Sequence, residues 1–377
     1  MIAKIPKHWK IKKLGEIGKV KMCKRIFKDQ TNKDSNGIPF YKIGTFGGIP
    51  DAFISKELYN EYKNKYPYPK KGDVLISAAG TIGRLVVFDG TPSYFQDSNI
   101  IWIENDENIA LNKYLYHLYS NVKWKTTEGG IISRLYNADV ESLELSIPPL
   151  KEQEKIAEIL LTCDKAIRLT TQIITQLKQR NQGLAQQLLT GEKRVKGFEK
   201  SVWKEVRLGE LLDYEQPTNY LVKNTDYSDE YKIPVLTAGK TFILGHTNEK
   251  EGICTNIPLI LFDDFTTDSR YIDFPFKVKS SAIKLLKAKK NVNLRFIFEA
   301  MKLIKYAIGG HERHWISKYA FLTIFVPSFK EQNAIAQILD TAHQEFKLYE
   351  QKLQLLLAQK KTLMQKLLTG EVLTIKK

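Results

Sequence analysis

Two stretches of the chain contain polar and charged side chains of the kinds that contact DNA, set between short apolar runs and glycine turns. Arginine pairs with guanine, asparagine or glutamine with adenine, and aspartate with cytosine, because their hydrogen-bonding groups match those base edges. In the first stretch the candidates are Lys42, Thr45, Ser77, Thr81, Arg84, Gln96, Ser98, Asn99 and Arg134. In the second stretch they are Gln216, Thr218, Tyr220, Thr237, Lys240, Asp263, Asp264, Thr266, Ser280, His311, Arg313, His314 and Ser317. For each residue alone, a solvated loop position is the alternative interpretation.

Motifs that would indicate catalysis are incomplete. The segment TAGKT at 237–241 is similar to the end of a phosphate-binding loop, but Pro234 stands where the first glycine is required. The chain has no Asn-Pro-Pro-Tyr motif of the adenine-methyltransferase type. Asp51, Glu61 and Lys63 loosely match a nuclease pattern, although nothing places the two carboxylates on adjoining strands to share a metal ion. We therefore predict no catalytic residue in this chain.

Potential metal ligands are sparse. His311 and His314 are three residues apart and lack a third ligand, so we predict a basic loop there and no zinc site. The cysteines, Cys23, Cys163 and Cys254, are odd in number, far apart and without close Cys or His partners. Their spacing favours neither disulfides nor metal binding.

The net charge of +16 and the isoelectric point near 9.4 indicate an acidic partner, since basic surfaces attract phosphate backbones. A ribosomal partner, a membrane-surface partner or a charge excess that only aids solubility are the alternatives. Hydrophobic residues make up 43% and aromatic residues 11% of the chain, which is typical of a folded soluble protein. No run approaches the roughly 18 apolar residues that span a bilayer, and the amino terminus has no apolar signal core. We therefore expect a cytoplasmic protein with no membrane contact.

A tandem repeat must position the candidate residues. The segment IPPLKEQEKIAEIL at 147–160 returns as VPSFKEQNAIAQIL at 326–339, and LLTGE at 188–192 returns at 367–371. Lys151 matches Lys330 and Glu192 matches Glu371 at one constant offset, so the stretch between the motifs has the same length in both copies. Proline opens each stretch, and Gly191 or Gly370 follows its last leucine as a left-handed cap.

Apolar residues within the repeated stretch alternate at spacings of four and three, which is the seam of a coiled coil. The seam positions are Ile156, Leu160, Cys163, Ile167, Ile174, Leu177, Leu184 and Leu188 in the first copy, and Ile335, Leu339, Ala342, Phe346, Tyr349, Leu353, Leu356, Leu363 and Leu367 in the second. Asn181 and Lys360 are matched polar seam positions, a device that commonly fixes register. About 40 helical residues make a rod of about 60 Å.

Each repeat begins with a globular domain of mixed α/β pattern. Short apolar runs at 38–48, 72–89 and 98–104 precede a helical run at 112–120, and runs at 231–241, 257–265 and 281–287 precede one at 294–302. A pair of glycines and then a strand lead into each long helix. We therefore expect domains at 1–146 and 196–325 and coiled-coil helices at 147–195 and 326–377. The domains differ in length although the helices do not, which suggests a fixed scaffold with variable recognition domains.

Two unlike domains, each followed by a helix that opens with P-x-x-K-E-Q-x-x-I-A-x-I-L and closes with L-L-T-G-E, resemble the specificity subunit of type I restriction-modification systems. The resemblance covers the whole chain, and its motif occurs twice in phase. The segment GDVLISAAGTIG at 72–83 is also similar to the target-recognition domains of that family, whereas the second domain has no equivalent glycine pattern.

The resemblance implies a non-catalytic subunit that binds a bipartite site on double-stranded DNA and recruits two methyltransferase subunits and a restriction (motor-nuclease) subunit. S-adenosylmethionine, ATP and magnesium would then belong to the partners, with no cofactor in this chain. A DNA-binding adaptor of another defence or regulatory system, and an enzyme fused to recognition domains, are the alternatives.

The order of the elements predicts a similar geometry. The first helix ends where the second domain begins, so the second helix must return antiparallel to bury its seam against the first. We therefore expect mixed α/β target-recognition domains in tandem, separated by a long antiparallel two-helix coiled coil with pseudo-two-fold symmetry. Such a rod would set the spacing of two half-sites, and because the domains differ we expect an asymmetric target.

Overall fold

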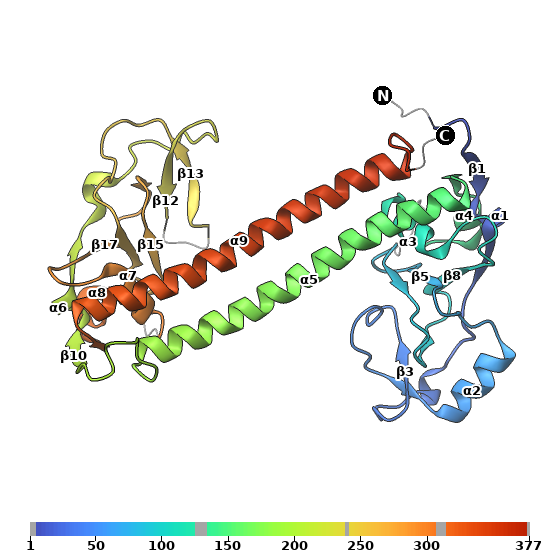
Figure 1. Cartoon of the computed structure of the whole chain (residues 1–377), viewed down its shortest axis with the longest axis horizontal. Coiled ribbons are helices and arrows are strands. Elements are labelled where there is room, and N and C mark those ends of the chain that lie inside the picture. Colours follow the sequence, from blue (N-terminus) through green and yellow to red (C-terminus); the bar gives the residue numbers. More distant parts are fainter. Residues whose placement is uncertain (1–4, 125–133, 238–240, 307–313, 375–377) are drawn as a thin grey trace. The chain divides into compact units, whose positions relative to one another are not determined.

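The chain forms two compact units, each of which contains one globular domain and portions of two long helices. The computed structural model describes residues 5–124, 134–237, 241–306 and 314–374, so the candidates Lys240, His311 and Arg313 lie outside the described residues. The first unit contains Met1–Thr171 and Lys352–Lys377, and the second contains Gln172–Gln351. The long helices are α5 (Leu150–Leu189) and α9 (Phe329–Leu368) (Figure 1).

The first domain consists of two sheets and a strand pair. The antiparallel four-stranded sheet has the order β2 (Gly18–Lys21), β8 (Ile100–Asn105), β5 (Val74–Ser77) and β6 (Leu85–Val87). The three-stranded sheet has the order β4 (Phe53–Ile54), β3 (Ile38–Tyr41) and β7 (Tyr94–Phe95). The strand pair is β1 (Lys10–Lys13) with β9 (Glu144–Ile147). The helices are α1 (Leu14–Ile17), η1 (Lys28–Gln30), α2 (Lys56–Lys65), α3 (Asn112–Asn121) and α4 (Asn137–Glu141).

The second domain repeats this topology strand for strand. Its four-stranded sheet has the order β11 (Leu212–Glu215), β17 (Ile283–Ala288), β14 (Leu259–Asp263) and β15 (Ser269–Ile272). Its three-stranded sheet has the order β13 (Ile243–Thr247), β12 (Ile233–Leu236) and β16 (Lys277–Val278), and its strand pair is β10 (Lys204–Arg207) with β18 (Thr323–Val326). The helices are α6 (Leu208–Leu211), η2 (Pro217–Tyr220), α7 (Leu294–Met301), α8 (His314–Ser317) and η3 (Tyr319–Phe321). The predicted mixed α/β class with tandem domains is confirmed.

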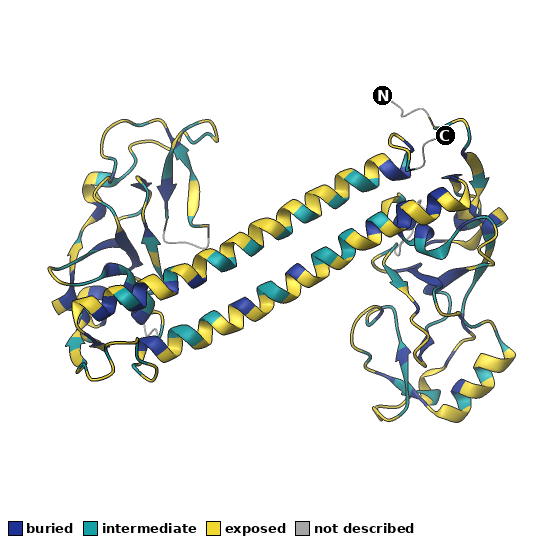
Figure 2. Ribbon diagram, in the orientation of Figure 1, coloured by how far each residue is buried: buried dark blue, intermediate teal, exposed yellow. Residues whose placement is uncertain are grey.

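The central strands of each domain are buried on both faces, which explains their uninterrupted apolar sequences. Val74 and Ile76 of β5 belong to the core that includes the long helices, whereas Leu75 belongs to the core under the three-stranded sheet. In β14, Phe262 likewise belongs to the core that includes the long helices, and Leu261 belongs to the core under the three-stranded sheet. Successive strand residues point to opposite faces, so each central sheet separates two cores. Figure 2 shows these strands as the buried interior of each domain.

In the first unit the start of α5 packs against the end of α9, so the helices are antiparallel there (Figure 1). Leu160 and Leu367 share one core. The polar seam residue Lys360 forms an ion pair with Asp164 of the facing helix. His117 of α3 is fully buried 3.8 Å from Asp164, and burial lowers the pKa of its imidazole to about 4. The imidazole is therefore neutral at pH 7.

In the second unit the end of α5 packs against the start of α9, again antiparallel. Leu188 and Ile335 share one core, and the polar seam residue Asn181 donates from Nδ2 to the carbonyl oxygen of Ala342 at 2.9 Å. Every apolar position of the predicted seam is buried or half-buried in the two helices. Gly191 and Gly370 adopt left-handed conformations, with φ of +75° and +73°, as predicted for the helix caps.

The glutamine of the repeated K-E-Q motif anchors each long helix to its own domain. Gln153 of α5 accepts the backbone N–H of Leu111, just before α3, at 2.8 Å. Gln332 of α9 accepts the backbone N–H of Asn293, just before α7, at 2.9 Å. Both side chains also donate to the proline carbonyl five residues earlier. The motif therefore has a structural role in positioning domain and helix.

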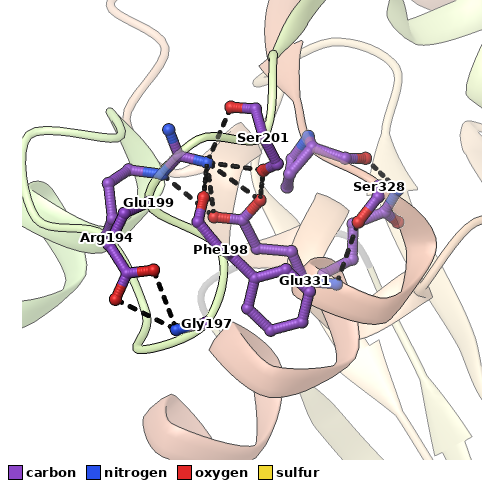
Figure 3. A network of polar contacts seen from close by, with 9 residues as sticks. Arg194, Gly197, Phe198, Glu199, Ser201, Ser328 and Glu331 are labelled. Atoms are coloured by element: carbon purple, nitrogen blue, oxygen red, sulfur yellow. Dashed lines mark hydrogen bonds and ion pairs between the residues drawn. The ribbon is translucent and has the colours of Figure 1, made fainter.

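The glutamate of the same motif is buried in both units. Glu331 accepts hydrogen bonds from Arg194, with Nη2 to Oε1 at 2.9 Å, and from the hydroxyl of Ser201, which connects the linker after α5 to the start of α9 (Figure 3). Glu152 accepts from Trp9 Nε1 at 3.2 Å and contacts His8 Nε2 at 2.9 Å. The glutamate at this position of the motif therefore connects a segment outside the long helices to the start of each long helix.

Several local predictions need correction. The run at 72–89 is two strands, β5 and β6, joined by a glycine turn, and the strand expected at 38–48 ends at Tyr41. The long helices begin three residues after the predicted boundaries, since the strands β9 and β18 and the following prolines come first.

Candidate nucleic-acid interface

A basic groove of about 680 Å³ opens in the first domain where the chain passes from the three-stranded to the four-stranded sheet. The four residues between β7 and β8, Gln96 to Asn99, form one side of it. The lining residues are Arg25, Ile26, Phe27, Lys28, Thr31, Asn32, Lys33, Phe40, Lys42, Ala52, Gln96, Asp97, Ser98, Asn99 and Arg134. We refer to these residues as the basic groove. Five cationic side chains and one carboxylate give it a net positive charge.

The backbone of the β7–β8 connection is held in an unusual conformation. Ser98 has a φ of +59°, which non-glycine residues rarely adopt. Arg134 donates from Nη2 to the carbonyl oxygen of Ser98 at 2.6 Å and so fixes this turn. Ala79 forms an isolated antiparallel bridge with Arg134, which brings the strand end of β5 to the same place. Three segments distant in sequence therefore meet at Ser98.

Two amides in the groove retain unused hydrogen-bonding groups. Gln96 accepts the backbone N–H of Ile43 at 2.9 Å through Oε1, and within the described residues its Nε2 makes no hydrogen bond. The side chain of Asn99 likewise has no hydrogen bond within that part of the chain, although its carbonyl accepts from Ala78 at 2.7 Å. Amides of this kind can pair with the major-groove edge of adenine.

The cations of the groove differ in their partners. Arg25 pairs with Asp97 at 2.9 Å, and Lys42 pairs with Asp51 at 2.7 Å. The pKa of the Asp51 carboxyl is lowered, mainly by the hydrogen bond from Lys42. Lys28 and Arg134 have no carboxylate partner among the described residues. The groove therefore has uncompensated positive charge, which suits it to a phosphate backbone.

The remaining candidates of the first domain form the loops beside the groove. Ser77 is buried, donates from its hydroxyl to the Thr81 carbonyl at 2.5 Å and accepts the backbone N–H of Arg84 at 2.8 Å. The Arg84 guanidinium donates to the Phe46 carbonyl at 2.8 Å. Thr45 accepts the backbone N–H of Lys42 at 3.1 Å. Ser77, Thr81 and Arg84 thus hold the glycine turn, and only Lys42, Gln96, Ser98, Asn99 and Arg134 line the basic groove.

In the second domain Asp263, the last residue of β14, and the following Asp264 are buried, and both accept hydrogen bonds within the fold. Asp263 accepts the hydroxyl of Thr266 at 2.5 Å and the backbone N–H of Phe265 at 3.0 Å. Asp264 accepts the backbone N–H of Trp315 at 2.8 Å and lies 3.4 Å from the ammonium of Lys284. These aspartates hold the turn and the start of α8.

The other candidates of the second domain lie in loops and short helices around both of its sheets. Gln216 accepts from the buried ammonium of Lys284 at 2.9 Å, and Tyr220 donates to Glu215 at 2.9 Å, next to Thr218 in η2. Ser280 accepts the backbone N–H of Ala282 at 3.1 Å. His314 is fully buried. The other two lie on the same domain: Thr237 follows β12, and Ser317 ends α8.

The backbone places Leu135 and His314, the residues that follow Arg134 and Arg313 in the sequence, in matched positions. Leu135 donates its N–H to the carbonyl of Ala78 after β5, and His314 donates its N–H to the carbonyl of Asp264 after β14. Each arginine is the residue just before that donor in the sequence. Arg313 itself lies outside the described residues.

Sequence reasoning missed three cations of the basic groove, Arg25, Lys28 and Lys33. They come from the segment between β2 and β3. The candidates were chosen from loops between apolar runs expected to form strands, and this segment does not lie between two such runs. Its density of basic residues between 24 and 33 is the signal that could have found them. Within the described part of the chain, no group of three potential metal ligands occurs, and no helix combines the length and apolarity needed to cross a membrane.

Known proteins are similar to this chain in sequence, some over part of its length and one over nearly all of it. A type I restriction enzyme specificity subunit of Haemophilus influenzae is 62% identical over 164 residues, which are 44% of this chain and 42% of that relative. The EcoR124I/EcoR124II specificity subunit of Escherichia coli is 47% identical over 146 residues, 35% of this chain and 36% of that relative. These alignments span less than half the length of either relative. The MjaX specificity subunit of Methanocaldococcus jannaschii is 25% identical along 98% of this chain and 95% of that protein.

Solved structures share the fold. The type I restriction-modification S subunit of M. genitalium superposes with a TM-score of 0.68 and 16% identity over 97% of this chain and 96% of that one. A chain from a structure on complex assembly and conformational transition of the type I R-M system gives a TM-score of 0.53 and 16% identity over 98% and 100%. The sequence model of the type I restriction modification DNA specificity domain matches residues 6–179 and 200–358, one match for each repeat. The chain therefore belongs to the type I restriction modification DNA specificity family.

Proposed function

We propose that this chain gives a type I restriction-modification complex its DNA specificity, with each domain reading one half of a bipartite, asymmetric target. The main support is that the two domains have the same strand order but carry different side chains in their matched loops. The β7–β8 connection contains Gln96 and Asn99, whereas the matched β16–β17 connection contains Lys279 and Ser280. Two half-sites of unlike sequence require this combination of one fold and two surfaces.

The basic groove is the proposed contact surface of the first domain. Lys28 and Arg134 supply charge for phosphates, and the free amide groups of Gln96 and Asn99 supply donors and acceptors for base edges. Phosphate contacts fix the orientation of a protein on DNA, and base contacts determine the sequence that it prefers. The groove offers both kinds of contact within one surface.

The long helices are the proposed docking surface for two methyltransferase subunits. Leu169 of α5 is 43% exposed and Leu348 of α9 is 63% exposed, and the constant offset of the repeat makes them equivalent. Equivalent exposed leucines on the two helices suit two copies of one partner. Methylation, translocation and cleavage, with S-adenosylmethionine, ATP and magnesium, would belong to those subunits and to the restriction (motor-nuclease) subunit.

Sequencing of methylated bases in host DNA, with and without this gene, tests the proposal. Deletion should abolish methyladenine at one bipartite, asymmetric motif, and restoring the gene should restore it. An unchanged set of methylated motifs would contradict the proposal and favour an adaptor of another system. Methylation or cleavage of DNA by the purified chain alone would favour an enzyme fused to recognition domains.

A further inference from the structure

The first unit contains a second groove, of about 920 Å³, between its domain and the long helix α5. Val87 of β6 and Tyr116 of α3 line it from the domain, and Leu161 and Ile167 line it from the helix. Val87 is 46% exposed and Leu161 is 42% exposed, so this groove presents apolar side chains to solvent. We refer to it as the α3–α5 groove.

The second unit has an equivalent groove of about 650 Å³, the α7–α9 groove. Matched glutamines of α5 and α9 anchor the residues before α3 and α7 in the same way, so Lys113 of α3 matches Arg295 of α7. The constant offset of the repeat matches Leu161 with Asp340. The two grooves can therefore be compared residue by residue.

The grooves differ at these matched positions. Arg295 and Asp340 form an ion pair, with Nε to Oδ1 at 2.7 Å, which connects domain and helix in the second unit. In the first unit Lys113 pairs instead with Glu154 at 2.8 Å, and Leu161 occupies the place of the aspartate. An ion pair therefore spans the α7–α9 groove at the position where the α3–α5 groove leaves apolar surface exposed.

Cations border the open groove. Lys71 and Arg168 line it, and neither forms an ion pair with any residue that the structure describes. Apolar surface beside unpaired cations complements an apolar side chain with acidic neighbours. Arg168 and Leu169 follow Leu161 by seven and eight residues, a spacing that places them on one face of α5. Arg168, which lines the groove, is therefore the immediate neighbour of the proposed docking residue Leu169.

We propose that the α3–α5 groove receives an apolar side chain from an acidic segment of the methyltransferase subunit, and that the α7–α9 groove, which the Arg295–Asp340 ion pair spans, receives none. This inference rests on the proposed function. It predicts that the two copies of the methyltransferase bind with unequal affinity and that the first unit binds the tighter copy.

The test uses the full chain with Leu161→Asp, which copies the residue of the second unit. Binding of the methyltransferase subunit encoded with this chain is followed by calorimetric titration, and the composition of each complex by native mass spectrometry. The unchanged chain should bind two copies in separate steps. L161D should weaken the tighter step at least about tenfold, because it removes a leucine contact and repels acidic neighbours. Lys71→Glu should weaken the same step while Leu161 is retained.

Ile49→Asp is the matched control, since Ile49 is 88% exposed on the first domain and does not line this groove. It should leave both steps unchanged. Equal affinities in the unchanged chain, or an L161D variant that binds both copies normally, would overturn the inference while leaving the proposed function intact. A loss of DNA affinity in L161D with normal methyltransferase binding would assign the groove to DNA and also overturn it. An unchanged chain that binds no methyltransferase would contradict the proposed function as well.

Discussion

Arg134 is the residue on which the basic groove most depends. Its guanidinium fixes the left-handed turn at Ser98, and its charge has no carboxylate partner among the described residues. The side chain thus combines loop positioning with free charge in one place. Arginine is suited to this combination, because its planar group donates several hydrogen bonds and always remains charged.

Arg134→Ala should weaken DNA binding of the assembled complex without altering its assembly. Loss of one phosphate contact would lower affinity for all sequences alike and reduce the slope of log affinity against log salt by about one, whereas loss of a base contact would cost about 1–3 kcal/mol at one position of the target only. Fluorescence anisotropy with cognate and altered duplexes over a salt series distinguishes these results. Lys56→Ala on α2, outside the groove, is the control and should bind normally. Normal binding by R134A would remove Arg134 from the interface.

Residue types and loop positions predicted only part of the groove. Lys42, Gln96, Ser98, Asn99 and Arg134 come together as groove residues because strand ends meet where the two sheets diverge. The same reasoning also selected polar residues that accept hydrogen bonds from within the fold, such as the buried aspartates Asp263 and Asp264 at the end of β14. Whether a polar loop residue faces solvent depends on contacts with distant segments, and its own sequence neighbourhood does not contain that information.

At the scale of elements, prediction succeeded where the periodicity was long or the burial complete. The long helices have a seam over many turns, and the central strands are apolar on both faces. The helix α2 was not predicted, because Tyr59 is its only buried residue and its apolar pattern is correspondingly weak. The strands β1 and β10 were also missed, since three of the four residues in KIKK and in KEVR are charged.

The buried glutamate at the start of α9 should contribute strongly to stability. Glu331 is fully buried, and its partner Arg194 is only 21% exposed (Figure 3). Glu331→Gln should lower the free energy of unfolding by about 2–4 kcal/mol, because it leaves a partly buried guanidinium without its counter-charge. Urea denaturation measures the change. Glu345→Gln, which removes a partner of the exposed Arg180, should cost at most about 1 kcal/mol. Equal effects of the two variants would show that the buried network adds no more to stability than the exposed ion pair.

For the whole molecule, the repeat gives both units the same connections between domain and helix. Each long helix begins in one unit and ends in the other, and each begins with the same glutamate and glutamine anchors. The domains can therefore diverge in sequence while the junctions stay the same. The matched polar seam residues, Asn181 and Lys360, each form a contact with the facing helix, which favours a single register of the pair.

This architecture predicts that helix length sets the spacing of the two half-sites. Seven residues duplicated after Thr171 in α5 and after Gln351 in α9 would keep both seams in phase and lengthen each helix by about 10 Å. Because DNA rises 3.4 Å per base pair, the methylated motif should keep both half-sites and gain about three base pairs of spacer. Sequencing of methylated bases in cells that express the variant reads this directly. Duplication in α5 alone shifts its seam relative to that of α9 and should abolish methylation. This control tests whether the helix pair tolerates a mismatch in length. A lengthened pair that methylates the original motif would show that the helices do not determine the spacer.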